Sequence, residues 1–262
     1  MKRGITALQH QYRDSSNFRK RSALIGKFST NRYPWYRWVN DQFELSSGST
    51  VLELGCGPGS LWKRNLDRLP PRSTIVLSDF SAGMLRDSGR NLDVNRSRFS
   101  FCQLDAAVLP FRAECFDAIV ANMMFYHVDD RPAALRDIRR VLRPDGRFYA
   151  TTTGREYMRE LNAAATRILQ IPRHTPSAER FGLENGLEQL HSVFARVEIR
   201  RYHNELRVTE VEPLIDYFAS MEPFISPPPE RWSVLREYFQ NTINEHGEIA
   251  IPIDVGMLIA RD

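Results

Sequence analysis

The chain is poor in cysteine and has no long apolar run. It holds three cysteines in 262 residues, Cys56, Cys102 and Cys115, and their spacing is not that of a zinc site. We expect reduced, mostly buried thiols and no metal centre. No apolar segment reaches membrane length, and the first residues lack the apolar region of a secretory signal peptide. These absences predict a cytoplasmic protein without a membrane segment.

Lysine is also scarce, because only four of the 36 basic residues are lysines. A formal net charge of +4 could indicate a nucleic-acid partner. The basic residues are nevertheless dispersed along the chain, apart from Arg19-Lys20-Arg21 and paired arginines on predicted helices. We interpret them as solvated surface charge, so nucleic acid is not the expected partner.

Apolar runs of strand length alternate with segments of helical periodicity. Buried strands are predicted within 50–61 and 74–81 and at 99–104, 116–121 and 146–151, with two more at 195–202 and 254–260. Strands that alternate with helices form a parallel sheet covered on both faces. A length of 262 residues, 42% of them hydrophobic, suits one soluble domain of this kind.

Helix signals follow two of these strands. Ser81 is placed to cap a helix after the second strand, and Asp130 to cap one after the fourth, with Pro132 in the first turn. Four apolar residues recur on one face of that second helix: Leu135, Ile138, Val141 and Leu142. We predict that Pro144 ends it.

A glycine ladder follows the first strand. Gly55, Gly57 and Gly59 allow a sharp turn and a close backbone approach to a ligand, although glycines also close ordinary turns. The second strand ends in Asp79, where related folds hold ribose hydroxyls. A dinucleotide fingerprint would have its third glycine at position 60, which is Ser60 here. The pattern therefore favours a nucleoside ligand other than a dinucleotide.

Five motifs in order carry a resemblance to a known family. They are Val51-Leu52-Glu53-Leu54-Gly55-Cys56-Gly57-Pro58-Gly59, Leu77-Ser78-Asp79-Phe80-Ser81, Asp105 through Leu109-Pro110-Phe111, Phe116-Asp117-Ala118-Ile119-Val120 and Val141 through Phe148. With these, residues 45 to 153 resemble the class I S-adenosylmethionine-dependent methyltransferases, particularly the small-molecule group that is similar to ubiquinone/menaquinone C-methyltransferases.

The resemblance implies a set of donor-binding residues for S-adenosylmethionine, with S-adenosylhomocysteine as the product. The methionine part would be held by Glu53 and by the backbone around Gly55, Cys56, Gly57 and Gly59, with Asn122 beside its tail. Asp79 would bind the ribose. Phe80 would pack on the adenine, whose amino group would meet Asp105 and the backbone of Ala106. Asp105 could instead cap a turn, Phe80 could be core and Asn122 a turn residue.

The acceptor side is less well defined by the sequence. His127 follows the fourth strand and could act as a general base, or it could be structural. We expect a pocket for a small apolar or aromatic acceptor with walls from Tyr12, Tyr33, Trp35, Tyr126 and His127. Trp35 and Trp38 could equally dock their helix on the core. Asp129 and Asp130 could form a metal site, but capping explains Asp130 without one.

The expected architecture is α/β, a Rossmann-like, mostly parallel seven-stranded sheet with helices on both faces; the resemblance implies an antiparallel last strand. A helical lid is expected at 1–44, and the methyltransferase domain at 45–262, with helical insertions near 157–194 and 212–246. The oligomeric state, monomer or homodimer, is left open by the sequence.

Two other functions stay open. The chain could bind the donor as a regulator without transferring methyl groups, or its basic N-terminal arm could recruit RNA or protein as the acceptor. The segment Asn122-Met123-Met124-Phe125 stands where methyltransferases of nucleic-acid bases usually carry an Asn/Asp-Pro-Pro-aromatic tetrad, which counts against a base as acceptor. The arginine bias is typical of GC-rich bacterial genomes, where such enzymes often serve secondary metabolism.

Overall fold

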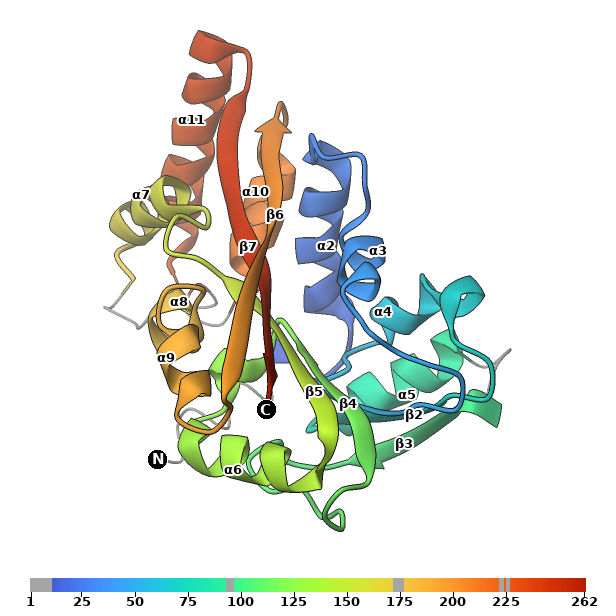
Figure 1. The fold of residues 1–262 in the computed structure, drawn as a ribbon. Coiled ribbons are helices and arrows are strands. Elements are labelled where there is room, and N and C mark those ends of the chain that lie inside the picture. The colour runs from blue at the N-terminus through green and yellow to red at the C-terminus, as the bar shows by residue number, and fades with distance from the viewer. Residues whose placement is uncertain (1–10, 93–96, 172–176, 222–223, 225–226) are drawn as a thin grey trace. The chain divides into compact units, whose positions relative to one another are not determined.

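The computed structural model describes residues 11–92, 97–171, 177–221, 224 and 227–262. Its seven-stranded sheet has the order β3-β2-β1-β4-β5-β7-β6 (Figure 1). The strands are β1 (Thr50–Leu54), β2 (Thr74–Asp79), β3 (Phe99–Gln103), β4 (Phe116–Asn122), β5 (Leu142–Thr153), β6 (Arg196–Val208) and β7 (Ile249–Arg261). The five strands β1 to β5 are parallel, and β7 is antiparallel to β5. The predicted Rossmann-like α/β sheet with an antiparallel last strand is confirmed.

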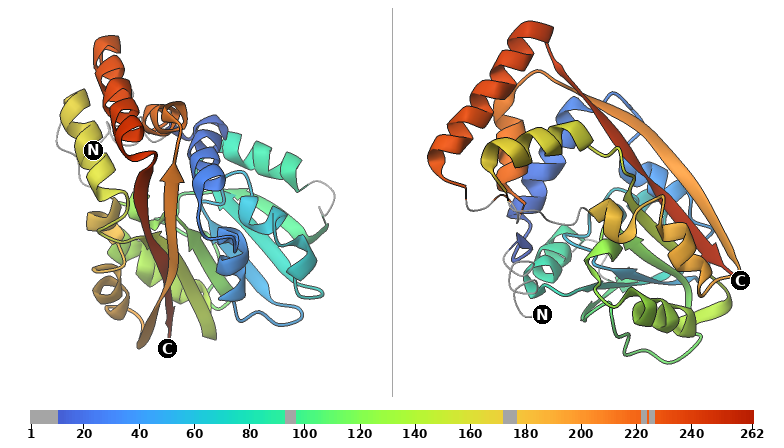
Figure 2. Two further views of the ribbon diagram at one scale, coloured as in Figure 1. Left: turned by 90° about the horizontal axis from the view of Figure 1, so that it is seen from above. Right: turned by 90° about the vertical axis from the view of Figure 1, so that its left-hand side faces the viewer.

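Contacts divide the chain into two compact units. Unit 1 comprises Met1–Arg32, Glu156–Thr175 and His203–Asp254, and unit 2 comprises Tyr33–Arg155, Pro176–Tyr202 and Val255–Asp262. Strands β6 and β7 run from one unit into the other, side by side and in opposite directions in both views of Figure 2. A helical lid that ends at residue 44 stays a prediction.

Unit 2 contains the predicted ligand-binding edge and has a core on each face of its sheet. Its helical elements are α3 (Trp35–Asp41), α4 (Ser60–Lys63), η1 (Leu66–Arg68), α5 (Ala82–Asn91), η3 (Phe125–His127), α6 (Arg131–Val141), α8 (Ser177–Phe181) and α9 (Gly186–His191). Because side chains alternate along a strand, Leu52 and Leu54 pack with α6 on one face, and Val51 packs with α3 and α4 on the other. We call these the α6 face and the α4 face.

The two predicted helix caps are present. Ser81 Oγ accepts a hydrogen bond from Met84 N at 3.2 Å, and Asp130 Oδ1 accepts one from Ala133 N at 3.0 Å. Each side chain satisfies a backbone N–H that has no partner inside its helix.

The prediction that Pro144 ends α6 was wrong. The helix ends at Val141, and β5 begins at the next residue. Leu142 pairs with Phe116, but the next pair is Arg147 with Ala118, so the pairing is irregular across the intervening residues. Pro144 lies in that irregular stretch, where its missing N–H breaks no ladder bond. Strands β6 and β7 also extend well beyond the predicted 195–202 and 254–260.

Unit 1 is mainly helical. It consists of α2 (Ser16–Phe28), α7 (Arg159–Leu169), α10 (Val211–Ala219) and α11 (Pro229–His246), together with the adjoining parts of β6 and β7. Phe218 of α10 stacks on Phe239 of α11 with ring centroids 6.2 Å apart, and both rings are fully buried. Among the described residues, none of the helices has both the length and the apolar composition that a membrane crossing requires.

Candidate functional site

The loop after β1 is held in an unusual backbone conformation. Gly55, Gly57 and Gly59 all have positive φ, at 59°, 54° and 73°. A Cβ at Gly55 would lie 2.9 Å from Met124 Cγ, and one at Gly59 would lie 2.5 Å from Ser88 Oγ. A Cβ at Gly57 would meet no atom of the described residues within 4 Å. Packing therefore requires glycine at 55 and 59, whereas Gly57 leaves open space into which a ligand can fit.

Asp79 ties this loop to the end of β2. Its Oδ2 accepts a hydrogen bond from Gly57 N at 2.9 Å, and its Oδ1 accepts one from Ser81 N at 2.8 Å. Burial raises the pKa of the carboxyl group, and these two hydrogen bonds oppose the rise. Asp79 thus shapes the loop in addition to any contact with a ribose, a role that the sequence did not reveal.

Glu53 is a buried acid at the carboxyl end of β1, with 1% of its surface exposed. Trp62 of α4 donates its indole N–H to Glu53 Oε2 at 2.7 Å. Burial, together with the nearby charge of Asp79, raises the pKa of Glu53 to about 8. The sequence analysis did not predict Trp62 as the partner of Glu53. The available signal was its position one turn after the glycine loop.

The backbone of Cys56 joins the glycine loop to β2. Its N–H donates to Ser78 O at 2.8 Å, while Ser78 Oγ donates to Glu53 O at 2.7 Å. Burial raises the pKa of the Cys56 thiol well above its ordinary value, with the charges of Glu53 and Asp79 adding to the effect. The thiol is therefore a neutral packing group.

The predicted adenine side lies at the ends of β2 and β3. Phe80 is 42% exposed, and Gln103 Nε2 donates to its carbonyl oxygen at 3.0 Å. Asp105 Oδ1 accepts a hydrogen bond from Ala107 N at 2.9 Å, so Asp105 does close a turn. Ala106 is buried inside that turn. Phe80 is therefore available for stacking on a ligand. Asp105 closes a turn, which is the structural role that the sequence left open beside ligand binding.

The chain turns sharply after β4. Met123 has a positive φ of 54°, which is uncommon for a residue other than glycine. Its N–H donates to Thr151 Oγ1 at 2.8 Å, and its carbonyl accepts from Tyr126 Oη at 2.7 Å. Thr151 Oγ1 in turn lies 2.7 Å from Asn122 Oδ1. Thr151 was not predicted, and its place on β5 far along the chain gave no local signal.

His127 and Tyr126 lie in η3, directly after this turn. Their ring centroids are 4.6 Å apart, and His127 N donates to Met124 O at 2.8 Å. Asp129 pairs with Arg180 at 2.5 Å, and Asp130 caps α6, so both acids have structural partners. Within the described ranges, no group of three or more His, Cys, Asp or Glu side chains could hold a metal ion.

The aromatic residues predicted for the acceptor pocket are distributed over both units. In unit 2, Trp35 stacks on Trp38 with ring centroids 5.3 Å apart, and the edge of Tyr202 contacts both indoles. The exposed Tyr33 binds Asp41 and Arg68. Tyr12 belongs to unit 1, where Arg21 lies 5.4 Å from its ring centroid. Trp35 and Trp38 thus dock their helix on the core, which the sequence left open as the alternative to a pocket wall. A contact with the acceptor stays a prediction.

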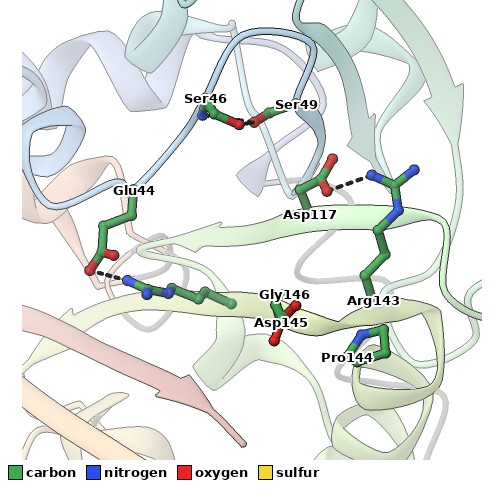
Figure 3. A pocket seen from close by; sticks show the side chains of 9 residues that line it. Glu44, Ser46, Ser49, Asp117, Arg143, Pro144, Asp145 and Gly146 are labelled. Atoms are coloured by element: carbon green, nitrogen blue, oxygen red, sulfur yellow. Dashed lines mark hydrogen bonds and ion pairs between the residues drawn. The ribbon is translucent and has the colours of Figure 1, made fainter.

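A polar cavity of about 330 Å³ lies at the opposite, amino-terminal edge of the strands. Figure 3 shows the ion pair of Arg143 with Asp117 in its wall. Arg147, another lining residue, pairs with Glu44. Its other lining residues are Ser46, Ser49, Pro144, Asp145 and Gly146. These residues surround the amino ends of β1 and β4, so the cavity is separate from the predicted donor site.

Comparison with known proteins agrees with this geometry. Residues 52–150 match the family model of a methyltransferase domain. The chain is 34% identical over 117 residues to the ubiquinone/menaquinone biosynthesis C-methyltransferase UbiE of Hahella chejuensis, covering 44% of this chain and 47% of that protein. The chain thus spans about half the length of the curated relative that it matches.

Solved structures share the fold at low identity. A putative methyltransferase from an antibiotic biosynthesis pathway of Anabaena variabilis superposes with a TM-score of 0.65 at 17% identity, over 88% of this chain and 99% of that one. The [4+2]-cyclase SpnF superposes with a TM-score of 0.59 at 18% identity, over 97% and 95% of the two chains. At these identities the likeness establishes a common fold.

Proposed function

We propose that this chain, whose residues 52–150 match the model of a methyltransferase domain, is a class I S-adenosylmethionine-dependent methyltransferase that transfers a methyl group to a small-molecule acceptor. The observation that carries the proposal is the loop of Gly55, Gly57 and Gly59. Its central glycine is left-handed, open on one side and held through its N–H by Asp79. Such a loop gives a nucleoside-bearing ligand close access to the backbone.

The residues present fit the methyl donor. Glu53 and the loop backbone would hold its methionine part, with Cys56 contributing backbone only. Asp79 would accept hydrogen bonds from the ribose, since a carboxylate that already accepts two N–H groups retains further lone pairs. Phe80, exposed at the end of β2, would stack on the adenine, with Asp105 and Ala106 at its amino edge.

The protein's own contribution is orientation and the exclusion of water. When bound, S-adenosylmethionine supplies an electrophilic methyl group, which an acceptor attacks in one in-line displacement. Aligning the two reactants lowers the entropic part of the barrier, and a dry site strengthens the polar contacts within it. In this proposal His127 receives the proton of an acceptor hydroxyl, because a neutral imidazole is a suitable base near pH 7.

The aromatic side chains of Tyr33, Trp35 and Tyr126, which all belong to unit 2, favour an apolar or aromatic acceptor. Secondary metabolism in the cytoplasm is the setting we propose. The arginine bias of the sequence is the observation that favours this setting. We also propose the helical lid at 1–44 and the insertions near 157–194 and 212–246 as the variable parts of the protein.

Gly57→Ala tests whether the methyl donor occupies the open space beside Gly57. We expect calorimetric titration with S-adenosylhomocysteine to show binding by the wild type and at least about tenfold weaker binding by Gly57→Ala. Gly48→Ala is the matched control, because Gly48 also has a positive φ and nothing near its Cβ position among the described residues. Both variants should lower the melting temperature similarly, since a left-handed alanine costs about 1 to 2 kcal/mol.

This pair of variants is sharper than Asp79→Ala, which would also release Gly57 N–H and disturb the loop. Absence of binding by the wild type, or equal affinity of Gly57→Ala and Gly48→Ala, would contradict the donor site.

A second candidate function is donor binding without methyl transfer. A protein described as a [4+2]-cyclase has the same fold, so the fold by itself does not specify methyl transfer. Binding of S-adenosylhomocysteine without methyl transfer to any of a broad acceptor panel would support it. A role for the N-terminal arm in recruiting RNA or protein concerns residues 1 to 22, of which the first ten lie outside the described residues.

A further inference from the structure

A buried threonine hydroxyl lies at the centre of the turn after β4. Thr151 is fully buried on β5 and pairs in register with Asn122 on β4. Met123 N–H donates to Thr151 Oγ1 at 2.8 Å, and Oγ1 lies 2.7 Å from Asn122 Oδ1. One hydroxyl therefore contacts both residues at the end of the neighbouring strand.

The proton count of this hydroxyl determines which way the Asn122 amide faces. The hydroxyl of Thr151 has one proton, and Met123 N–H already occupies one of its lone pairs. Among the described residues, Asn122 Oδ1 is the acceptor that remains for that proton. Rotating the amide by 180° would place an NH₂ group there and leave a buried hydroxyl proton unpaired, which folded proteins avoid. The amide oxygen of Asn122 is therefore directed at Thr151.

The amide nitrogen is then turned outwards. Within the described chain, Asn122 Nδ2 has no hydrogen-bond partner, and its side chain is half-buried. Glu53 pairs with Val120, two residues before Asn122, so Glu53 and Asn122 project from the same α4 face at the carboxyl ends of adjacent strands. Asn122 can only donate at this position.

The turn is also fixed against the glycine loop. The Met123 carbonyl accepts from Tyr126 Oη at 2.7 Å while its N–H binds Thr151, so both peptide groups of the left-handed residue are held. The side chain of Met124 fills the space beside Gly55, where a Cβ would lie 2.9 Å from Met124 Cγ. The amide donor of Asn122 is thus set beside the loop that we propose holds the methionine part of the donor.

We infer that Thr151 is a positioning residue that fixes Asn122 as a donor to the carboxylate of the methionine part, and not as a partner for its ammonium group. This inference rests on the proposed function. It follows from chemistry, because an NH₂ group matches a carboxylate oxygen and an ammonium offers it no lone pair. An amine nitrogen of an acceptor molecule would find no amide oxygen at this position for the same reason.

The test compares two probes in calorimetric titrations, S-adenosylhomocysteine and its decarboxylated analogue, which keeps the amine but has no carboxylate. Thr151→Val removes the hydroxyl at nearly constant shape, and Thr151→Ser keeps it. We expect Thr151→Val to weaken S-adenosylhomocysteine binding about tenfold, a loss within the range for hydrogen bonds to charged groups. Thr151→Ser should stay within about threefold of the wild type, and Asn122→Asp should bind more weakly than Thr151→Val because it sets two carboxylates against each other.

Affinity for the decarboxylated analogue should be the same in Thr151→Val and the wild type. Thr152→Val is the matched control: Thr152 is the next residue of β5, equally buried, and its hydroxyl donates to Phe181 O at 2.5 Å on the α6 face. It should lose stability while keeping wild-type affinity for both probes.

Three results would overturn the inference while leaving donor binding intact: Thr151→Val with wild-type affinity, equal loss for both probes, or the same loss in Thr152→Val. A wild type that binds neither probe would instead remove the proposed function itself.

Discussion

At the scale of single residues, the site depends on buried polar groups that are paired. Glu53 would be costly to bury as an anion, because an unpaired charge loses its hydration. The protein holds it with one indole N–H from Trp62 and a pKa of about 8, so the acid is largely protonated in the ligand-free fold near neutral pH. A positively charged donor nearby would favour the ionised form.

Glu53→Gln should change how stability depends on pH. The pKa of Glu53 is about 8 in the fold against an ordinary value of 4.5, so the folded state keeps its proton between these values while the unfolded state loses it. The stabilisation is complete below pH 4.5 and is lost as the pH rises through 8. The free energy of unfolding should fall by up to about 1.4 kcal/mol per pH unit from this group.

Glutamine has no such proton, so the difference between wild type and variant isolates the contribution of Glu53. Urea unfolding of the ligand-free protein at about pH 5, 6.5 and 8 measures it. Parallel curves for the two proteins would show that Glu53 does not retain its proton in the fold.

At the scale of elements, short-range signals position the helices that follow the strands. Helix α6 begins where Asp130 accepts from Ala133 N, and its apolar residues pack under β4 and β5. This helix follows η3, so its start limits where Tyr126 and His127 can lie. The cap therefore contributes to the position of the predicted acceptor residues as well as to stability.

Asp130→Ala should lower the free energy of unfolding by about 1 kcal/mol, the usual value of a lost N-cap. Asp129→Ala is its neighbour and control, because Asp129 forms an exposed ion pair with Arg180 and such pairs contribute about 0 to 1 kcal/mol. Thermal unfolding followed by circular dichroism distinguishes the two. An equal or larger effect of Asp129→Ala would mean that the ion pair, not the cap, fixes this end of the helix.

At the scale of the whole molecule, each unit has its own core. Unit 2 has packed residues on both faces of its sheet, and unit 1 has stacked rings on α10 and α11. The residues predicted to bind the donor all lie in unit 2. Among the residues predicted for the acceptor pocket, Tyr12 lies in unit 1 and the others lie in unit 2. Donor binding can therefore be measured independently of the acceptor's identity.

Chelation should leave donor binding unchanged. Asp129 and Asp130 are engaged by Arg180 and by the α6 N-terminus, and the described chain offers no metal-binding group of three or more side chains. Titration with S-adenosylhomocysteine in about 1 mM EDTA should therefore give the affinity measured in buffer alone. Affinity or turnover that is lost in EDTA and restored by magnesium would contradict this expectation.

The secondary-structure elements and the glycine-rich loop could be predicted from the sequence. Apolar periodicity, the caps at Ser81 and Asp130, and the glycines at 55, 57 and 59 act over a few residues, so they can be found without knowing what packs against them. The alternation of strands and helices predicted the parallel sheet, and the order of the motifs predicted a resemblance to a methyltransferase family. Pro144 was misplaced because the local rule for helix ends ignores an irregular strand pairing.

The partners of the buried polar groups could not be predicted from the sequence, because they depend on the packed fold. Trp62 reaches Glu53 through the packing of α4, and Thr151 meets Asn122 because β5 lies beside β4 in one particular register. The directions of these hydrogen bonds, the open side of Gly57 and the raised pKa of Glu53 all depend on atoms that are distant in the chain. Burial and register are properties of the assembled sheet, and no local pattern of residues specifies them.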